Sequence, residues 1–186
     1  HTQFQIASIH AHMGAGYRDE NMDEYSTKKI LDTLIGIPAE YEIATHEMNR
    51  RGSGQGQLCG GNLALLSDLI GTPSDLNTTG KILVIEDIGE YKYNIDRMMW
   101  QLLRAGKLND LAGLIVGGFT GTLDNDTPFG MSEYEIIWEK VKSFSYPVCF
   151  NFPVGHQSLN YPLKMGAEFE LIVDANQVIL KEIVQA

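Results

Sequence analysis

The order of hydrophobic and polar residues predicts alternating strands and helices along most of the chain. Partly alternating, β-branched runs at residues 5–11 and 41–45 are typical of strands, and the first ends near the glycines of residues 13–16. Between the two runs, apolar side chains recur at helical spacing over 26–35, with Ser26 as the expected N-cap.

The second part of the chain repeats this pattern with longer apolar runs. Strands are predicted over 81–85, 114–119, 147–150, 169–173 and 178–183, and helices over 63–70, 95–103 and 132–141. The last two strands flank a polar turn and predict a terminal hairpin. The succession of strand and helix, closed by a hairpin, indicates an α/β fold with mixed strand directions.

One stretch departs from this pattern. Residues 49–61 are rich in Gly, Arg, Gln and Ser, a composition typical of a linker or surface loop. We therefore expect the main domain boundary there, with residues 1–48 on one side and residues 62–186 on the other.

Composition narrows the class of protein. The chain has 186 residues, 44% of them hydrophobic, and a formal net charge of −10, so it can bury a core but repels nucleic-acid phosphates. Its apolar runs fall short of the roughly 20 residues that cross a bilayer. Two cysteines, Cys59 and Cys149, lie far apart and lack CxxC spacing, which argues against a disulfide scaffold or a zinc site and favours the cytoplasm.

Two other motifs have simpler interpretations. Residues 51–56 contain a serine between glycines, but the spacing fits neither a nucleophile elbow nor a phosphate-binding loop, so a flexible loop is expected. Residues 124–126 resemble a calcium loop only in part, because the later ligands and the glycine are misplaced. The sequence thus predicts no metal and no cofactor.

The strongest chemical candidates follow predicted strands. Glu86 comes at the end of the apolar run 81–85, where α/β proteins place ligand-binding side chains. His156 follows the predicted strand 147–150 and stands next to Gly155, which relaxes the backbone. Acyl transfer by a serine requires an imidazole that takes the proton and a carboxylate that orients the imidazole. Glu86 and His156 could supply these two roles.

Several motifs around these residues form a set. They are GGNL at 60–63, IGTP at 70–73, IEDIGE at 85–90, IDRM at 95–98, QL at 101–102, VGGF at 116–119 and GH at 155–156. In this order and spacing the chain resembles the LD-carboxypeptidase family of serine peptidases. The resemblance implies a swivelling β/β/α-type C-terminal domain with mixed strands, preceded by a remnant of an α/β N-terminal domain.

The resemblance also implies residue roles. The family uses a Ser-Glu-His triad, whose glutamate falls on Glu86 and whose histidine falls on His156. We expect Asn62 to shape the substrate-binding cleft. Structural roles at the strand–helix junction are expected for three further charged residues. These are Glu90, Asp96 and Arg97.

The activity that the resemblance implies is metal-independent removal of the terminal D-alanine from an L,D-linked murein tetrapeptide, in a cytoplasmic homodimer. Two alternatives stay open. One is amide hydrolysis of the microcin C type, from the same family. The other is an acidic binding module without catalysis, which predicts that Glu86 and His156 lie more than about 8 Å apart with no shared cleft.

The family's nucleophilic serine has no counterpart in the sequence. In the family it lies in a G-[YF]-S-D-type turn, followed by a helix and a strand that ends in a histidine. The chain begins near that strand, because residues 9–13 resemble it. We therefore expect this chain to be the C-terminal part of the enzyme, inactive without the N-terminal domain.

Overall fold

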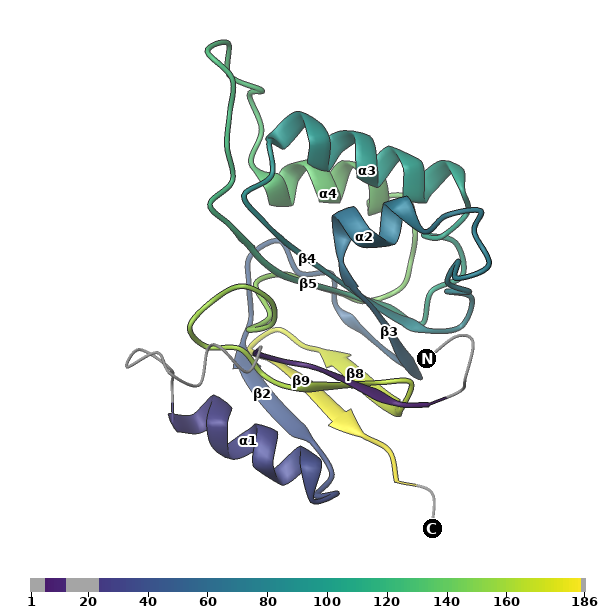
Figure 1. Ribbon diagram of the computed structural model, residues 1–186, viewed down its shortest axis with the longest axis vertical. Helices are drawn as coiled ribbons and strands as arrows, with labels where there is room; N and C mark the ends of the chain where they lie inside the picture. Colours follow the sequence, from purple (N-terminus) through teal and green to yellow (C-terminus); the bar gives the residue numbers. More distant parts are fainter. Residues whose placement is uncertain (1–5, 13–23, 185–186) are drawn as a thin grey trace.

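The computed structural model describes residues 6–12 and 24–184, and it confirms an α/β fold built on a mixed sheet (Figure 1). The predicted turn at residues 13–16 lies outside the described residues. The seven-stranded sheet has the order β2-β9-β8-β3-β4-β5-β6. Its strands are β2 (Glu40–Ala44), β3 (Gly52–Asn62), β4 (Ile82–Ile88), β5 (Gly113–Thr120), β6 (Val148–Cys149), β8 (Glu168–Val173) and β9 (Gln177–Glu182).

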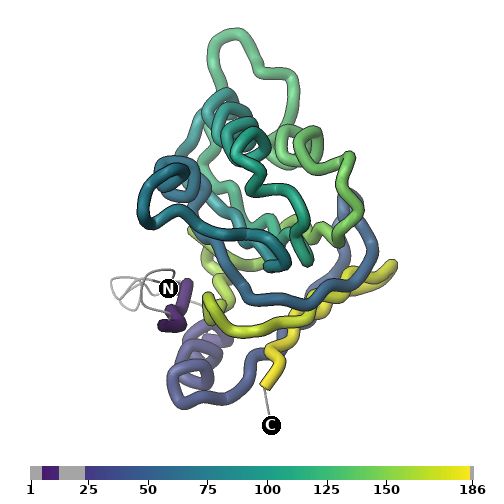
Figure 2. Tube along the Cα trace, turned by 90° about the vertical axis from the view of Figure 1, so that its right-hand side faces the viewer, coloured from purple at the N-terminus to yellow at the C-terminus, as the bar shows by residue number. Residues whose placement is uncertain are grey.

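A small second sheet and four helices complete the described fold. The small sheet pairs β1 (Ser8–His10) with β7 (Leu163–Met165) in antiparallel fashion. The helices are α1 (Glu24–Leu34), α2 (Leu63–Asp68), α3 (Lys92–Arg104) and α4 (Glu133–Val141). In two perpendicular views, α2, α3 and α4 lie at one end of the molecule, and α1 with β1 lies at the other (Figures 1 and 2).

The strand β3 joins the two halves of the large sheet. Its first half pairs antiparallel with β8, and its second half pairs parallel with β4. The prediction of a linker or surface loop at 49–61 was therefore wrong. The glycines serve close packing instead of flexibility, because a Cβ on Gly54 would overlap the carbonyl oxygen of Ala112 and one on Gly60 would overlap that of Val84.

The strand β4 is buried on both faces, as its continuous apolar run predicts. Leu83 and Ile85 face the core beneath the helices, whereas Ile82 and Val84 face the core that β8 and β9 share. This alternation follows from the two-residue period of a strand. The same alternation turns Glu86 and Asp87 toward opposite faces of the sheet.

Other predicted elements agree in type with the structure. The hairpin of β8 and β9 is confirmed, and Ser132 caps α4 in a capping box with Glu135. Ser26 does not cap α1: it lies inside the helix, where its buried hydroxyl accepts a hydrogen bond from the Asn160 amide. The pairing of β1 with β7 was not predicted, because short strands leave little pattern.

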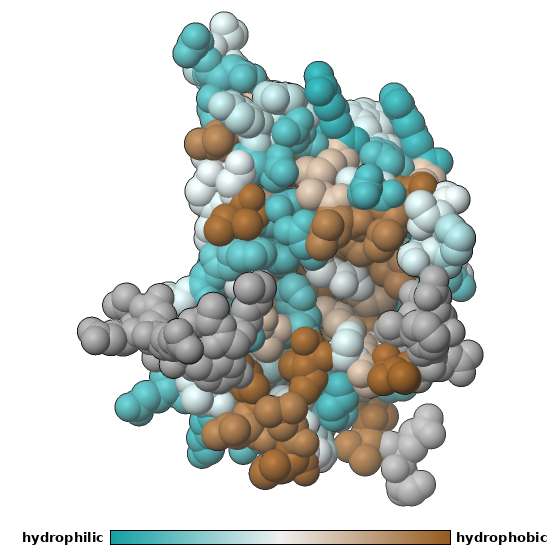
Figure 3. All heavy atoms as spheres, in the orientation of Figure 1, coloured by the Kyte–Doolittle hydropathy of each residue, from teal (hydrophilic) through white to brown (hydrophobic). Residues whose placement is uncertain are grey.

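The outer face of α1 and the turn after it carry exposed apolar side chains. They are Leu31, Leu34, Ile35 and Ile37. Figure 3 shows apolar side chains gathered in the lower part of this view, where α1 lies. An apolar patch of this kind is typical of an interaction surface.

The packing of β3 yields a stability prediction. Gly54→Ala should lower the free energy of unfolding by about 1–3 kcal/mol, because the added methyl group meets the backbone of Ala112. Urea unfolding of the chain would measure the change. The exposed neighbour Ser53 is the control, and Ser53→Ala should stay within about 0.5 kcal/mol of the wild type. Equal stability of the two variants would mean that this segment is not packed as a strand.

Candidate active site

Glu86 lies in the C-terminal part of β4, opposite Asn62 of the parallel strand β3. Its side chain is completely buried, with 0% of its surface exposed. An ionised carboxylate loses several kcal/mol of hydration in such a place unless charged or hydrogen-bonding groups compensate. The polar groups around Glu86 therefore determine whether the carboxylate can stay ionised in this position.

His156 lies in the loop that follows β6, not directly at the strand end. The loop runs along β5, because the Phe152 amide donates to the Val116 carbonyl at 3.1 Å and the Gly118 amide donates to the Val154 carbonyl at 3.0 Å. The hydroxyl of Thr120, the last residue of β5, donates to the His156 carbonyl at 2.9 Å. These contacts fix the backbone that carries the imidazole.

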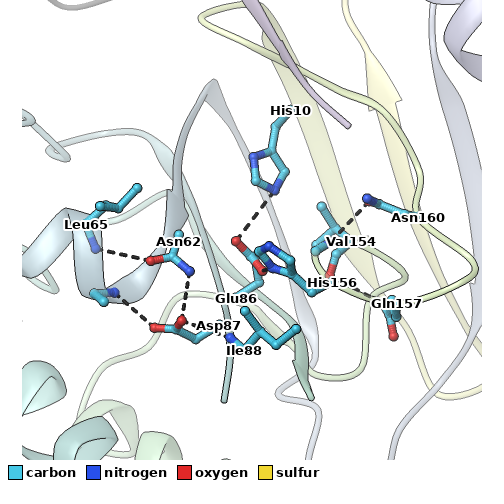
Figure 4. Close-up of polar contacts among 12 residues, drawn as sticks. His10, Asn62, Leu65, Glu86, Asp87, Ile88, Val154, His156, Gln157 and Asn160 are labelled. Carbon is cyan, nitrogen blue, oxygen red and sulfur yellow. Dashed lines mark hydrogen bonds and ion pairs between the residues drawn. The ribbon is translucent and has the colours of Figure 1, made fainter. Parts of the chain in front are cut away.

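The structure brings Glu86 and His156 into direct contact. The Nδ1 atom of His156 lies 2.8 Å from Oε2 of Glu86 (Figure 4). The imidazole is about half exposed, with 48% of its side-chain surface accessible. A neutral imidazole that donates from Nδ1 presents Nε2 as a proton acceptor. The pair can thus act as a general base whose tautomer is set by a buried carboxylate.

Glycines make room for the carboxylate. A Cβ on Gly155 would lie 2.6 Å from Oε2 of Glu86, and one on Gly117 would lie 3.1 Å from the Cβ of Glu86. Gly155 also has φ +107, and its amide donates to the Asn160 side chain at 3.1 Å. Two physical constraints therefore favour glycine at position 155: the positive φ of the backbone and the close approach of the Glu86 carboxylate.

Asp87 points the other way, toward the start of α2. Its two carboxylate oxygens accept hydrogen bonds from the Asn62 side chain at 2.8 Å and from the Ala64 amide at 3.0 Å. Asn62 also accepts from the Leu65 amide at 3.2 Å as the N-cap of the helix. Both polar ends of the Asn62 side chain thus hold the α2 junction, and a role in substrate binding stays a prediction.

A residue that the sequence analysis missed completes the group. Nε2 of His10, the last residue of β1, lies 3.8 Å from Oε1 of Glu86 (Figure 4). Burial lowers the pKa of His10 below its ordinary value, with Glu86 opposing this shift and His156 adding to it. Only a histidine at a strand end could have signalled this in the sequence, and that signal is weak.

The three charged residues expected to have structural roles make contacts that suit such roles. Glu90 accepts from the Asn94 side chain at 2.9 Å. Asp96 pairs with Lys140 at 2.6 Å and so joins α3 to α4. The Arg97 guanidinium lies over a tyrosine ring on its own helix.

The described residues contain no group of three or more His, Cys, Asp or Glu side chains arranged to hold a metal ion. Cys59 and Cys149 are free thiols, and burial raises the pKa of each to about 12. Neither thiol is therefore a thiolate near neutral pH. No helix within the described ranges is both long and apolar enough to span a membrane.

Comparison with known proteins shows which family the chain belongs to. Residues 55–171 match the model of the LD-carboxypeptidase C-terminal domain. The chain belongs to this family, which confirms the resemblance carried by its motifs.

Two bacterial relatives illustrate the match. The chain is 38% identical over 117 residues to the probable murein peptide carboxypeptidase of Bacillus subtilis, covering 63% of this chain and 37% of that protein. It is 31% identical over 128 residues to the murein tetrapeptide carboxypeptidase of Pseudomonas aeruginosa, covering 68% of this chain and 41% of that protein. The chain thus spans less than half the length of either relative.

Solved structures share the fold. Muramoyltetrapeptide carboxypeptidase from Oxalobacter formigenes superposes with a TM-score of 0.85 at 25% identity, over 95% of this chain and 60% of that one. The microcin C7 self-immunity protein MccF superposes with a TM-score of 0.82 at 15% identity, over 100% of this chain and 64% of that one. The second likeness concerns the fold alone.

The tight packing of Gly155 against Glu86 leads to a second stability prediction. Gly155→Ala should lower the free energy of unfolding by about 2–5 kcal/mol, because overpacking against the Glu86 carboxylate adds to the strain of a positive φ. Gly130 is a matched control, since it has φ +83 but no neighbouring atom within 4 Å of an added Cβ.

Gly130→Ala should therefore lose only the strain, about 1–2 kcal/mol. Urea unfolding of both variants separates the two contributions. If the two variants were equally stable, the Glu86 carboxylate could not lie against Gly155 as described.

Proposed function

We propose that the protein carrying this chain is a serine carboxypeptidase that hydrolyses an L,D-peptide bond, and that Glu86 and His156 belong to its Ser-Glu-His triad. The observation that carries the proposal is the 2.8 Å contact between Nδ1 of His156 and the fully buried Glu86 carboxylate. Family membership supports the class of reaction. The serine and the oxyanion-hole amides are proposed to come from the rest of the longer protein.

The proposed reaction uses the two ends of the imidazole differently. Nε2 of His156 takes the proton of the serine hydroxyl as the oxygen attacks the peptide carbonyl carbon. The same proton then passes to the amine of the leaving D-amino acid as the peptide bond breaks. Glu86 holds Nδ1–H throughout and stabilises the imidazolium that forms. Water then attacks the acyl-enzyme and releases the shortened peptide.

We propose a murein tetrapeptide as the substrate and its terminal D-alanine as the product. The named relatives from Bacillus subtilis and Pseudomonas aeruginosa support this choice. The microcin-type alternative has support only from a shared fold. The non-catalytic alternative expects Glu86 and His156 far apart, and their direct contact does not favour it. The cytoplasmic location, the homodimer and the assignment of residues 1–48 to a separate domain stay predictions.

The proposal predicts loss of activity in two variants of the longer protein. Glu86→Gln and His156→Ala should each lower kcat for D-alanine release from a murein tetrapeptide by about 10³-fold or more, as removal of a triad member does elsewhere. The assay would quantify free D-alanine over time.

Glu42→Gln on the exposed edge strand β2 is the matched control, and it should turn over like the wild type. Near-wild-type turnover in either triad variant would exclude the assignment. Faster hydrolysis of a peptidyl-nucleotide of the microcin type than of the tetrapeptide would instead move the substrate to the alternative class.

A further inference from the structure

The Glu86 carboxylate has two oxygens with unequal surroundings. Oε2 lies 2.8 Å from His156 Nδ1. Within the part of the chain that the structure describes, Oε1 is buried and has no hydrogen-bond partner. An ionised oxygen in that position calls for a donor, because burial removes the water that would otherwise solvate it. The side chain that forms an ion-pair contact with Oε1 is His10, whose Nε2 lies 3.8 Å away.

His10 is held beside Glu86 by its strand, by a neighbouring histidine and by the packing of its ring. The strand β1 pairs with β7, and this pairing sets His10 opposite Leu163. His12 reaches the Ser158 carbonyl with Nε2 at 3.3 Å, which ties the segment to the His156 loop. The ring also lies over Gly61, where an added Cβ would come 3.7 Å from Nδ1. The same loop and the strand after it therefore locate both histidines.

We propose that His10 is a positioning residue of the site, which donates Nε2–H to Oε1 of Glu86 and so fixes the carboxylate that orients His156. This inference rests on the proposed function. A shift of less than 1 Å brings the 3.8 Å separation into hydrogen-bond range. With both oxygens bonded, the carboxylate cannot rotate away from His156, and its charge is shared between two donors.

The charge state of His10 suits this role. Burial, the largest cause, lowers its pKa. Among the described residues, Glu86 from β4 and His156 from the loop after β6 act electrostatically on its ring, and Gly61 of β3 lies against the ring. A neutral His10 donates one hydrogen bond without placing a second positive charge near the imidazolium of His156. His10 therefore supports the carboxylate without opposing protonation of the triad histidine.

The test compares two substitutions of His10 in the longer protein. His10→Leu keeps bulk over Gly61 but removes the donor, whereas His10→Gln retains an N–H. His10→Leu should lower kcat by about 10- to 100-fold, the range seen for groups that orient metal-binding histidines indirectly, with KM little changed. His10→Gln should recover most of the loss. Ser8→Ala, at an exposed position of β1, is the control and should leave kcat unchanged.

The pH profile distinguishes positioning from a merely structural role. Without a donor on Oε1, more negative charge faces His156, and Glu86 itself protonates more readily. Both effects move the acid limb of kcat/KM to higher pH, by roughly 0.5–1 unit in His10→Leu. The limb should stay near the wild-type position in His10→Gln. NMR titration of the His156 imidazole should show the same direction of shift.

Each result has a definite meaning. If Glu86→Gln and His156→Ala abolish turnover but His10→Leu matches the wild type in kcat and acid limb, the His10 inference is wrong and the triad stands. Equal losses in His10→Leu and His10→Gln, with no displaced acid limb, would also overturn it. Activity retained in the Glu86 and His156 variants would remove the proposed function and this inference together.

Discussion

The buried carboxylate of Glu86 lies toward the C-terminal end of β4, a parallel strand in the middle of the sheet. Because burial removes the water that would solvate this carboxylate, the surrounding residues have to make room for it and bond to it. Glu86 replaces lost water with His156 on one oxygen, because a buried charge without partners costs several kcal/mol. Gly155 and Gly117 lack the side chains that would collide with it. The loop after β6 is in turn bonded along β5. The site geometry thus follows from fitting one buried carboxylate against the histidine that bonds one of its oxygens.

Strand pairing in the sheets fixes the positions of the segments around Glu86. β3 is antiparallel to β8 at its start and parallel to β4 at its end, so one strand sets the register of both halves. The end of β3 places Asn62 beside Glu86 and begins α2. The chain after His156 returns as β7 and β8, which pair with β1 and β3. The segments that bear His10, Glu86 and His156 are therefore fixed by a continuous set of strand pairings.

Much of this could be predicted from the sequence, for identifiable reasons. Buried parallel strands such as β4 and β5 appear in the sequence as continuous apolar runs. The helix α4 was predicted from the helical spacing of apolar residues after Ser132. Glu86 was found because it comes at the end of such a run, and His156 because it follows a predicted strand next to Gly155. The strand β3 was wrongly predicted as a loop, because glycine occurs both in flexible loops and where two backbones lie in close contact. His10 was missed because its place beside Glu86 depends on a pairing with β7 across most of the chain.

Two adjacent carboxylates show how strand geometry divides chemistry from structure. Glu86 and Asp87 are both nearly inaccessible to solvent, yet successive side chains in a strand point to opposite faces. Glu86 faces His156, whose exposed imidazole can exchange protons with a substrate. Asp87 faces backbone and amide donors at the start of α2, which can only hold it in place. Two neighbouring acids of nearly identical chemistry thus differ in role because the strand turns them to opposite faces. Glu86 faces a histidine that can exchange a proton, whereas Asp87 faces amide N–H groups that cannot.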